Sequence, residues 1–215
     1  MSIAFDASDD FAQIGDALET VVLARRVTHE AVPNVTAQRG ELITLESISS
    51  GGTVGRSDAV WHVQLLAGVA QPELGDVLID TQGNRWTVLE VQEFPLLGRW
   101  KCRTRELRVA YGCDDRVDVQ RAVWDDLGSG LEIVDWDYVY TALPVRIQPE
   151  TSTASDTSDM PTLTSRFQIV LGEPFPLEPD DRFVSPEGTV YRIESIQQAE
   201  RIDVLPVATV IRMDA

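Results

Sequence analysis

The chain has 215 residues, of which 43% are hydrophobic and 25% charged, as in ordinary globular proteins rather than disordered ones. Its 18 Lys and Arg residues against 35 Asp and Glu give a formal net charge of -17, the wrong sign for sequence-specific DNA binding. An acidic surface also keeps DNA from sticking inside a channel, although solubility explains the charge more simply. No apolar run approaches the roughly 20 residues that span a bilayer, and the acidic start lacks a signal peptide's features, so we expect the protein to be cytoplasmic when made.

The first half of the chain predicts a short helix followed by strands. Asp9 or Asp10 is placed to cap a helix that carries Phe11, Ile14 and Leu18 at spacings of three and four. β-branched and apolar residues then predict several strands, with a break at the proline of residue 33. These strands cover residues 19–27, 41–47, 59–67 and 100–109.

A hairpin pattern within this half, GDVLIDTQGNRWTVLEVQ at residues 75–92, returns as DDRFVSPEGTVYRIESIQ at residues 180–197. The apolar positions agree in size and parity, as with Trp86 and Tyr191. In each copy a glycine lies in the turn, where we expect the positive φ that glycine adopts without strain. A shift of 105 residues places identical residues together: Asp181 on Asp76, Gly188 on Gly83 and Gln197 on Gln92.

Upstream segments indicate that the repeat covers the whole chain. WHVQLLAG at residues 61–68 matches SRFQIVLG at residues 165–172 with a shift of 104, which places Gly68 on Gly172. The polar tracts SISSGGTVGRS and TSTASDTSDMP coincide at the same shift, and we expect both to be mobile loops. The sequence therefore predicts a tandem duplication with domains at residues 1–112 and 113–215.

The second half predicts the same kind of unit. A polar stretch at residues 110–121 is expected to hold the domain boundary. The turn DDLGSG at residues 125–130 predicts a hairpin, and Pro144 indicates that the next strand, residues 138–147, lies at a sheet edge. Further strands are predicted at residues 166–171, 182–185, 190–196 and 204–213. Many short strands separated by turns predict an all-β fold: two small antiparallel barrels or sandwiches, with a minor N-terminal helix.

The search for reactive groups predicts no enzyme, no cofactor and no metal. His29 and His62 are isolated and have no nucleophile motif around them. Cys102 and Cys113 do not show zinc-ligand spacing, so we expect them to be reduced and partly buried. Acidic pairs lack the alternating pattern of a calcium loop and are interpreted as turn formers; they are Asp76 with Asp80, Asp125 with Asp126, and Asp180 with Asp181.

The order of a strand, a long polar loop, a strand, a proline turn and a glycine hairpin resembles the head-tail joining (head-closure, or stopper) proteins of long-tailed bacteriophages. The hairpin motif is present as GDVLIDTQGNRWTVLEV in the first unit and as DDRFVSPEGTVYRIESI in the second. TALPVRIQPE at residues 141–150 resembles the strand before the family's long loop. The resemblance covers nearly the whole chain as two copies, whereas family members are usually single domains.

The resemblance implies a structural virion protein of the phage neck: a ring of small β-barrels beneath the portal and adaptor, with the long loops in the DNA channel. Implied partners are the portal or adaptor protein, the tail tube or tail terminator protein, and DNA that passes without sequence-specific binding, with no membrane. Twelvefold portal rings meet sixfold tails in this family, so a chain with two barrels favours a homo-hexamer. The channel-facing residues would be Ser49, Ser50, Gly51, Gly52, Thr53, Ser152, Thr153, Ser155, Asp156 and Thr157.

Two alternatives remain open from the sequence. A tail-terminator or baseplate ring protein would share the same small barrels. A tandem β module that binds carbohydrate or peptide belongs to a different class, and would use tryptophans expected at the surface: Trp61, Trp100, Trp124 and Trp136. Trp86 and Tyr191 at matched positions are expected in the cores rather than as base-stacking platforms.

Overall fold

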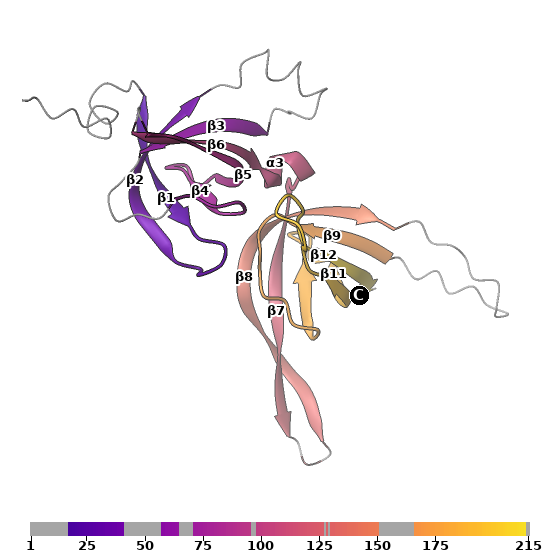
Figure 1. Ribbon diagram of the computed structural model, residues 1–215. Coiled ribbons are helices and arrows are strands. Elements are labelled where there is room, and N and C mark those ends of the chain that lie inside the picture. The colour runs from indigo at the N-terminus through magenta and orange to yellow at the C-terminus, as the bar shows by residue number, and fades with distance from the viewer. Residues whose placement is uncertain are drawn as a thin grey trace, which may run out of the picture. The chain divides into compact units, whose positions relative to one another are not determined.

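The computed structural model describes residues 17–40, 57–64, 71–95, 98–126, 128, 130–150 and 166–213. Within these residues, twelve strands and one short helix form two closed antiparallel barrels of six strands each (Figure 1). The contacts divide the chain into Met1–Ala110 with Arg201–Asp203, and Tyr111–Glu200 with Val204–Ala215. The prediction of an all-β fold with two tandem barrels is therefore confirmed.

The first barrel closes in the order β1-β2-β3-β6-β5-β4, with β4 paired back to β1. Inward side chains alternate with outward ones, as in β3, where Ala59, Trp61 and Val63 are buried in the core. Its strands are β1 (Leu18–Ala24), β2 (Ala31–Gly40), β3 (Asp58–Gln64), β4 (Val77–Ile79), β5 (Arg85–Phe94) and β6 (Arg99–Glu106).

The second barrel closes in the order β7-β8-β9-β12-β11-β10, which is the same pattern of neighbours six strands later. Phe183, Leu143 and Ile169 are among its fully buried side chains. Its strands are β7 (Asp115–Asp126), β8 (Leu131–Pro149), β9 (Arg166–Leu171), β10 (Asp181–Val184), β11 (Val190–Gln197) and β12 (Val207–Met213). The helix α3 (Leu107–Tyr111) precedes β7.

Irregular features repeat along with the strands. A bulge interrupts the β5–β6 ladder between Val88 and Glu90, and the β11–β12 ladder is interrupted 105 residues later, between Ile193 and Ser195. Gly83 and Gly188 adopt φ angles of 82° and 84°, so the positive φ predicted for both hairpin turns is confirmed. In each turn the glycine N–H donates to the carbonyl three residues earlier, at 3.0 and 2.9 Å.

A second pair of matching bulges places a non-glycine residue in the left-handed region. Asn34 of β2 and Ala142 of β8 have φ of 59° and 55°, and each lies where one residue of the partner strand faces two residues of its own. Pro33, which precedes Asn34, needs no ladder partner at such a bulge because it has no N–H to donate. This explains why β2 continues through a proline that the sequence analysis interprets as a break.

The strand pairings correct the alignment of β3 with β9. Trp61 pairs with Cys102, which pairs with Val91. In the second barrel Ile169 pairs with Ala208, which pairs with Ile196, the counterpart of Val91 at a shift of 105. Trp61 therefore corresponds to Ile169, a shift of 108, and the predicted shift of 104 is wrong by four residues. Because four is even, the predicted shift still places Val63 on Phe167, and both residues lie on the inward face of their strand.

Other boundaries also differ from prediction in the first barrel. Leu18 begins β1 instead of belonging to a helix, because it pairs with Gln38 of β2. The rest of the predicted N-terminal helix, from Asp9 to Ile14, lies outside the described residues, as does the predicted strand at 41–47.

In the second half, the end of a strand and a linker are corrected. Residues 107–109 lie in α3, where Leu107 is buried and Val109 is exposed, and residues 115–121 belong to β7. Pro144 does not lie at an edge, because β8 pairs with both β7 and β9 in the closed barrel. Its carbonyl accepts the N–H of Gly172 at 2.7 Å, so only its missing N–H is lost to the ladder.

Candidate functional site

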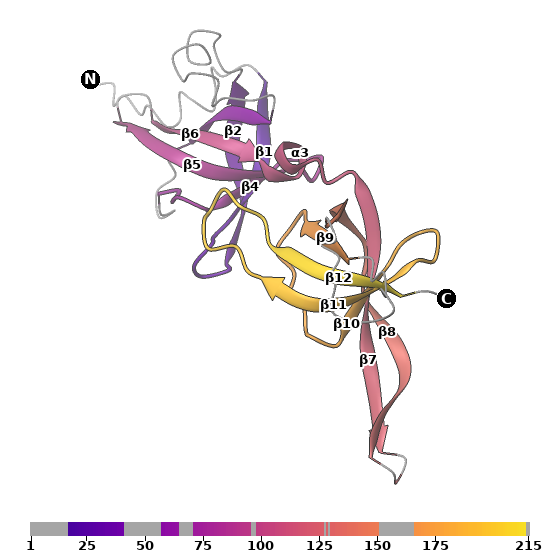
Figure 2. The same ribbon diagram turned by 90° about the vertical axis from the view of Figure 1, so that its right-hand side faces the viewer.

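The most distinctive surface feature is the hairpin between β7 and β8, which extends past the rest of its barrel as a long two-stranded ribbon (Figures 1 and 2). The pairings make Arg121 the counterpart of Arg25 and Tyr140 the counterpart of Val32. Arg25 and Val32 are seven positions apart, whereas Arg121 and Tyr140 are nineteen apart. The second barrel therefore carries twelve additional residues here. We call residues 122–139 the arm.

The arm is amphipathic across its two faces, because directly paired residues point to the same side of a ribbon. One face is acidic, with Asp125 paired to Glu132 and with Asp135 and Asp137 further along. The opposite, apolar face joins the pairs Trp124↔Ile133 and Ala122↔Trp136, with Leu131 and Tyr138 at its two ends. Leu131, Tyr138 and Trp124 are 70%, 61% and 46% exposed. Such a set of large exposed apolar side chains is typical of an interaction surface.

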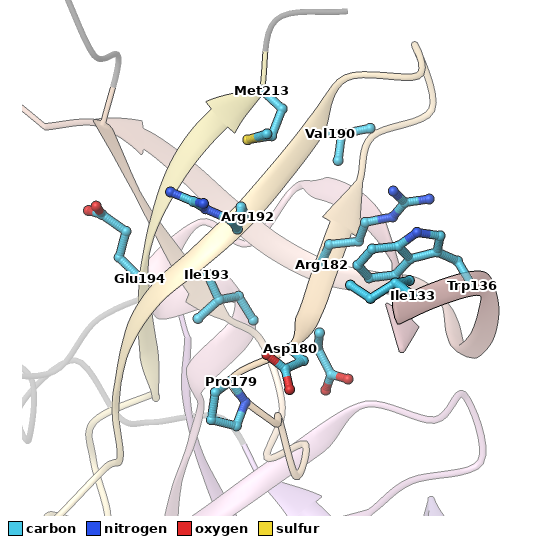
Figure 3. A pocket seen from close by; sticks show the side chains of 11 residues that line it. Ile133, Trp136, Pro179, Asp180, Arg182, Val190, Arg192, Ile193, Glu194 and Met213 are labelled. Atoms are coloured by element: carbon cyan, nitrogen blue, oxygen red, sulfur yellow. The ribbon is translucent and has the colours of Figure 1, made fainter. Parts of the chain in front are cut away.

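A groove of about 440 Å³ lies where the apolar face of the arm meets its own barrel (Figure 3). Ile133 and Trp136 line it from the arm, while Arg182, Val190 and Met213 are among the lining residues from β10, β11 and β12. The Arg182 guanidinium lies 3.7 Å from the centroid of the Trp136 ring, a cation–π contact. The Nε of Arg182 also donates to Gln120 at 2.8 Å, which orients it against the ring. The base of the arm is thus fixed against the barrel with its apolar face inward.

Each barrel also holds one buried ion pair at the corresponding position. Arg25 Nη1 lies 2.7 Å from Asp76 Oδ2, and Arg121 Nε lies 2.8 Å from Asp181 Oδ1. The two aspartate side chains are 3% and 0% exposed. The surrounding hydrogen bonds also repeat: each aspartate accepts a backbone N–H, from Glu73 or Glu178, and each arginine donates to a backbone carbonyl, of Gln71 or Pro176.

These ion pairs revise the interpretation of Asp76 and Asp181 as simple turn formers. Both carboxylates are saturated by an arginine and a backbone donor, which is what a buried charge requires. Their arginines were not found from the sequence, because Arg25 and Arg121 are 96 residues apart and fall outside the frame of 105 that reveals the hairpins. The aligned aspartates Asp76 and Asp181 were the one signal in the sequence for these ion pairs, because a buried carboxylate needs a positively charged partner.

Asp80 has a local structural role in the first hairpin turn. Its carboxylate accepts from the backbone N–H groups of Gln82 and Asn84, from the Asn84 amide and from Trp86 Nε1. Burial raises the pKa of Asp80, but these hydrogen bonds outweigh it and the net pKa is lowered, so the group stays ionised. Ser185 takes the corresponding place in the second barrel, where its hydroxyl accepts the N–H of Thr189.

The outer face of β6 is basic, which contrasts with the net charge of the chain. Arg99, Lys101, Arg103 and Arg105 alternate with the inward residues Trp100, Cys102 and Thr104. We call these four cations the β6 row. Arg105 pairs with Asp58 at 2.5 Å and Arg103 with Glu90 at 3.2 Å. Burial, followed by the charges of Arg99 and Lys101, lowers the pKa of the adjacent His62.

The cysteines are buried thiols. Neither Cys102 nor Cys113 is in a disulfide, and burial together with the Asp76 carboxylate raises the pKa of Cys102 to about 12. A neutral thiol is a poor nucleophile, so burial and the raised pKa both disfavour reaction at Cys102. Within the described ranges, no group of three His, Cys, Asp or Glu residues is arranged to hold a metal ion. The part of the chain that the structure describes has no helix both long and apolar enough to cross a membrane.

The predicted site residues have different outcomes. All ten predicted channel-facing residues, in the tracts 49–53 and 152–157, lie outside the described residues. Trp61 and Trp100 are buried, so they cannot serve as surface platforms for a ligand. Trp124 and Trp136 lie on the apolar face of the arm, and Trp124 remains exposed.

Comparison with known proteins adds no relative to this geometry: no protein-family model, curated protein or solved structure matches the chain.

Proposed function

We propose that the protein is a structural component of a phage neck, forming a ring that connects the capsid portal or adaptor to the tail and helps to retain DNA. The observation that carries the proposal is the pair of barrels with the same strand order, the same bulges and the same buried ion pair in one chain. This duplication agrees with the family resemblance of the two hairpin motifs. It supplies two similar binding units per chain.

Two similar units per chain suit a junction between rings of different symmetry. Six chains present twelve similar barrels to one neighbour and six identical chains to the other, while the ring itself keeps closed cyclic symmetry. The expected assembly is a hexamer in which the two barrels alternate around the ring at similar radius. The net charge of -17 disfavours phosphate contacts, so DNA would pass through such a ring without being held by it.

The test is native mass measurement of the purified protein combined with cryo-electron microscopy of particles. Six copies with alternating barrels are expected. Twelve copies, or barrels stacked along the tail axis, would contradict the hexamer even if the neck position holds, and absence from the neck would contradict the function. Deleting residues 49–55 or 152–158 should leave folding nearly intact, because loop length affects stability only logarithmically. The resulting particles should form and then lose DNA.

A binding module for carbohydrate or peptide is the second candidate, favoured by the groove beside Trp136. An aromatic ring flanked by an arginine, in a groove lined by both apolar and charged residues, can hold a sugar face or an extended peptide. A stable monomer that binds glycans or peptides, and loses them on Trp136→Ala, would favour this function over the ring. A tail-terminator or baseplate ring protein is distinguished from a neck protein by its position in the particle.

A further inference from the structure

The arm has no task within its own barrel. The first barrel closes with the same six ladders although only seven positions separate Arg25 from Val32, so the twelve additional residues are not needed for closure. Two-stranded ribbons are only marginally stable alone in water. In the described part of the chain, residues 122–126 of β7 pair only with β8, so the outer edges of the ribbon carry no further strand. Such a ribbon is expected to be completed by a partner.

The orientation of the arm decides which face a partner meets. Trp136 stacks on Arg182, and Ile133 lines the same groove, so the apolar face at the base of the arm is turned toward its own barrel (Figure 3). The acidic face, with Glu132, Asp135 and Asp137, therefore points away from that barrel. Four carboxylates lie on this face, beside Arg121 opposite Asp137, and they select a partner with positive charge.

The chain itself carries a surface of this kind. The β6 row has four cations at every second position, about 7 Å apart along the strand, and Asp135 and Asp137 repeat at the same interval. Arg103 and Arg105 already pair with Glu90 and Asp58, so an acidic ribbon along the row would share these cations with carboxylates of the barrel. Two arms cannot pair through their acidic faces, because like charges would oppose each other across the contact.

We propose that the arm of one copy docks its acidic face on the β6 row of a second copy of the chain. The two surfaces are different, so the contact is heterologous and repeats head to tail into a ring. The inference rests on the ring of the proposed function but not on its place in a virion. Docking holds the arm between two barrels and draws its apolar face closer to its own groove. Because the contact is charged, assembly weakens as salt rises.

Charge reversal tests this contact in the full-length protein. One variant reverses the arm (Glu132→Lys, Asp135→Lys and Asp137→Lys), and the other reverses the row (Arg99→Glu and Lys101→Glu). Each variant alone should lose self-association at least tenfold in sedimentation velocity or native mass measurements. Mixed in equal amounts, the two variants should associate again, because each interface then joins opposite charges. A chain carrying both reversals should recover in the same way.

A matched control separates the contact from a general effect of charge. Glu187→Lys, Glu200→Lys and Asp114→Lys change the net charge equally at exposed positions off the arm, and this variant should lose no association. Thermal unfolding of every variant establishes that the barrels remain folded. Misfolded chains could not associate again on mixing, so recovery would also show that the variants are folded.

Several outcomes would overturn the inference. They are a wild-type chain that stays monomeric at every concentration, arm and row variants that assemble like wild type, and variants that fail to recover on mixing. Loss of assembly on Trp124→Ser with Leu131→Ser, together with normal assembly of the charge-reversed arm, would show that the arm docks through its apolar face instead. A ring that depends on the arm but is missing from the neck of particles would leave this inference intact and refute the proposed function. A ring that lies in the neck but assembles without the arm would refute this inference and leave the proposed function intact.

Discussion

The two barrels keep the same ladders but fill their cores differently. In the first, Trp61 of β3 packs edge-to-face against Trp86 with ring centroids 6.0 Å apart. In the second, the counterpart of Trp61 is Ile169, and Phe167 packs against Tyr191 at 5.6 Å. Tyr191 corresponds to Trp86, whereas Phe167 corresponds to the small Ala59, one inward position before Trp61. The large ring has therefore moved along the strand while the aromatic contact was kept.

This exchange shows which properties the duplication has preserved. One of these two inward positions carries a large ring in each barrel, Trp61 in the first and Phe167 in the second, although the position itself is not retained. Several backbone features did not change in this way: the bulges after Val88 and Ile193, the left-handed residues Asn34 and Ala142, and the buried ion pairs coincide. The pairing of the strands is thus kept between the two barrels, whereas the identity of the core residues differs.

The largest expected effect comes from breaking the ion pair in each barrel. Arg25→Leu or Arg121→Leu leaves a buried aspartate without its counter-charge, which should lower the free energy of unfolding by about 3 kcal/mol. Hydrogen exchange of peptides from each barrel, measured on the full chain, should place the loss in the first barrel for Arg25→Leu and in the second for Arg121→Leu.

Two controls sharpen this comparison. Arg26→Leu removes an exposed arginine next to Arg25 and should have little effect. Adding Asp181→Asn to Arg121→Leu should recover part of the stability, since a neutral amide is easier to bury than a carboxylate. If single variants exchange like wild type, the ion pairs contribute nothing to either barrel.

The hairpin glycines should have an intermediate effect that is equal in the two barrels. Neither Gly83 nor Gly188 has a neighbour within 4 Å of an added Cβ, so substitution is limited by backbone strain alone. Gly83→Val and Gly188→Val should each destabilise by about 1 to 2 kcal/mol. Gly83→Asn is the control, because asparagine tolerates positive φ and should lose less. Equal melting of Val and Asn variants would contradict the strain.

Replacing the left-handed bulge residues with glycine should stabilise the two barrels by different amounts. Ala142 is held at a φ of 55° without the local hydrogen bonding that makes this region easier for asparagine, the residue at the matching position 34. Ala142→Gly should therefore stabilise the second barrel by up to about 1 kcal/mol, and Asn34→Gly should change the first by less. Chemical denaturation of both variants checks the order, and a larger gain at residue 34 would reverse the explanation.

The smallest expected effect is a dependence of the first barrel on pH. Burial, with Arg99 and Lys101, lowers the pKa of His62 below its ordinary value of 6.5, so the neutral ring is favoured in the folded state. The stability that this provides is present above about pH 6.5 and is lost as pH falls toward the lowered pKa. The pairings place Val170 at the matching position of the second barrel. His62→Gln should reduce the acid sensitivity of exchange in the first barrel only.

The sequence predicted the hairpins well because their turn chemistry is local. A glycine at positive φ, flanked by alternating apolar residues, specifies a turn and two strands without information from the rest of the chain. β7 was placed too late for a related reason: Val117 and Val119 are its inward residues, but polar residues lie between them and make the segment resemble a linker. The alternation typical of a strand was present in this segment, but it contained few apolar residues.

Features that depend on pairing between distant strands were not predictable. Nothing near Arg25 or Arg121 indicates that each closes a barrel by meeting an aspartate about fifty or sixty positions later. The arm shows the same limit: the hairpin around the turn at residues 125–130 was predicted, but not that its strands leave the barrel. That property follows from the length of β8 relative to its neighbour β9, which pairs only with Val145–Pro149.

The short strand β4 has a mechanical consequence. It is joined to β1 and to β5 by three residue pairs on each side, fewer than in any other strand described in the first barrel. Asp76 immediately precedes it, so the bond to Arg25 adds a lateral link where the sheet has least shear strength. Under tension along the chain, we expect the first barrel to rupture along β4. The arginine then sets the force at which it opens.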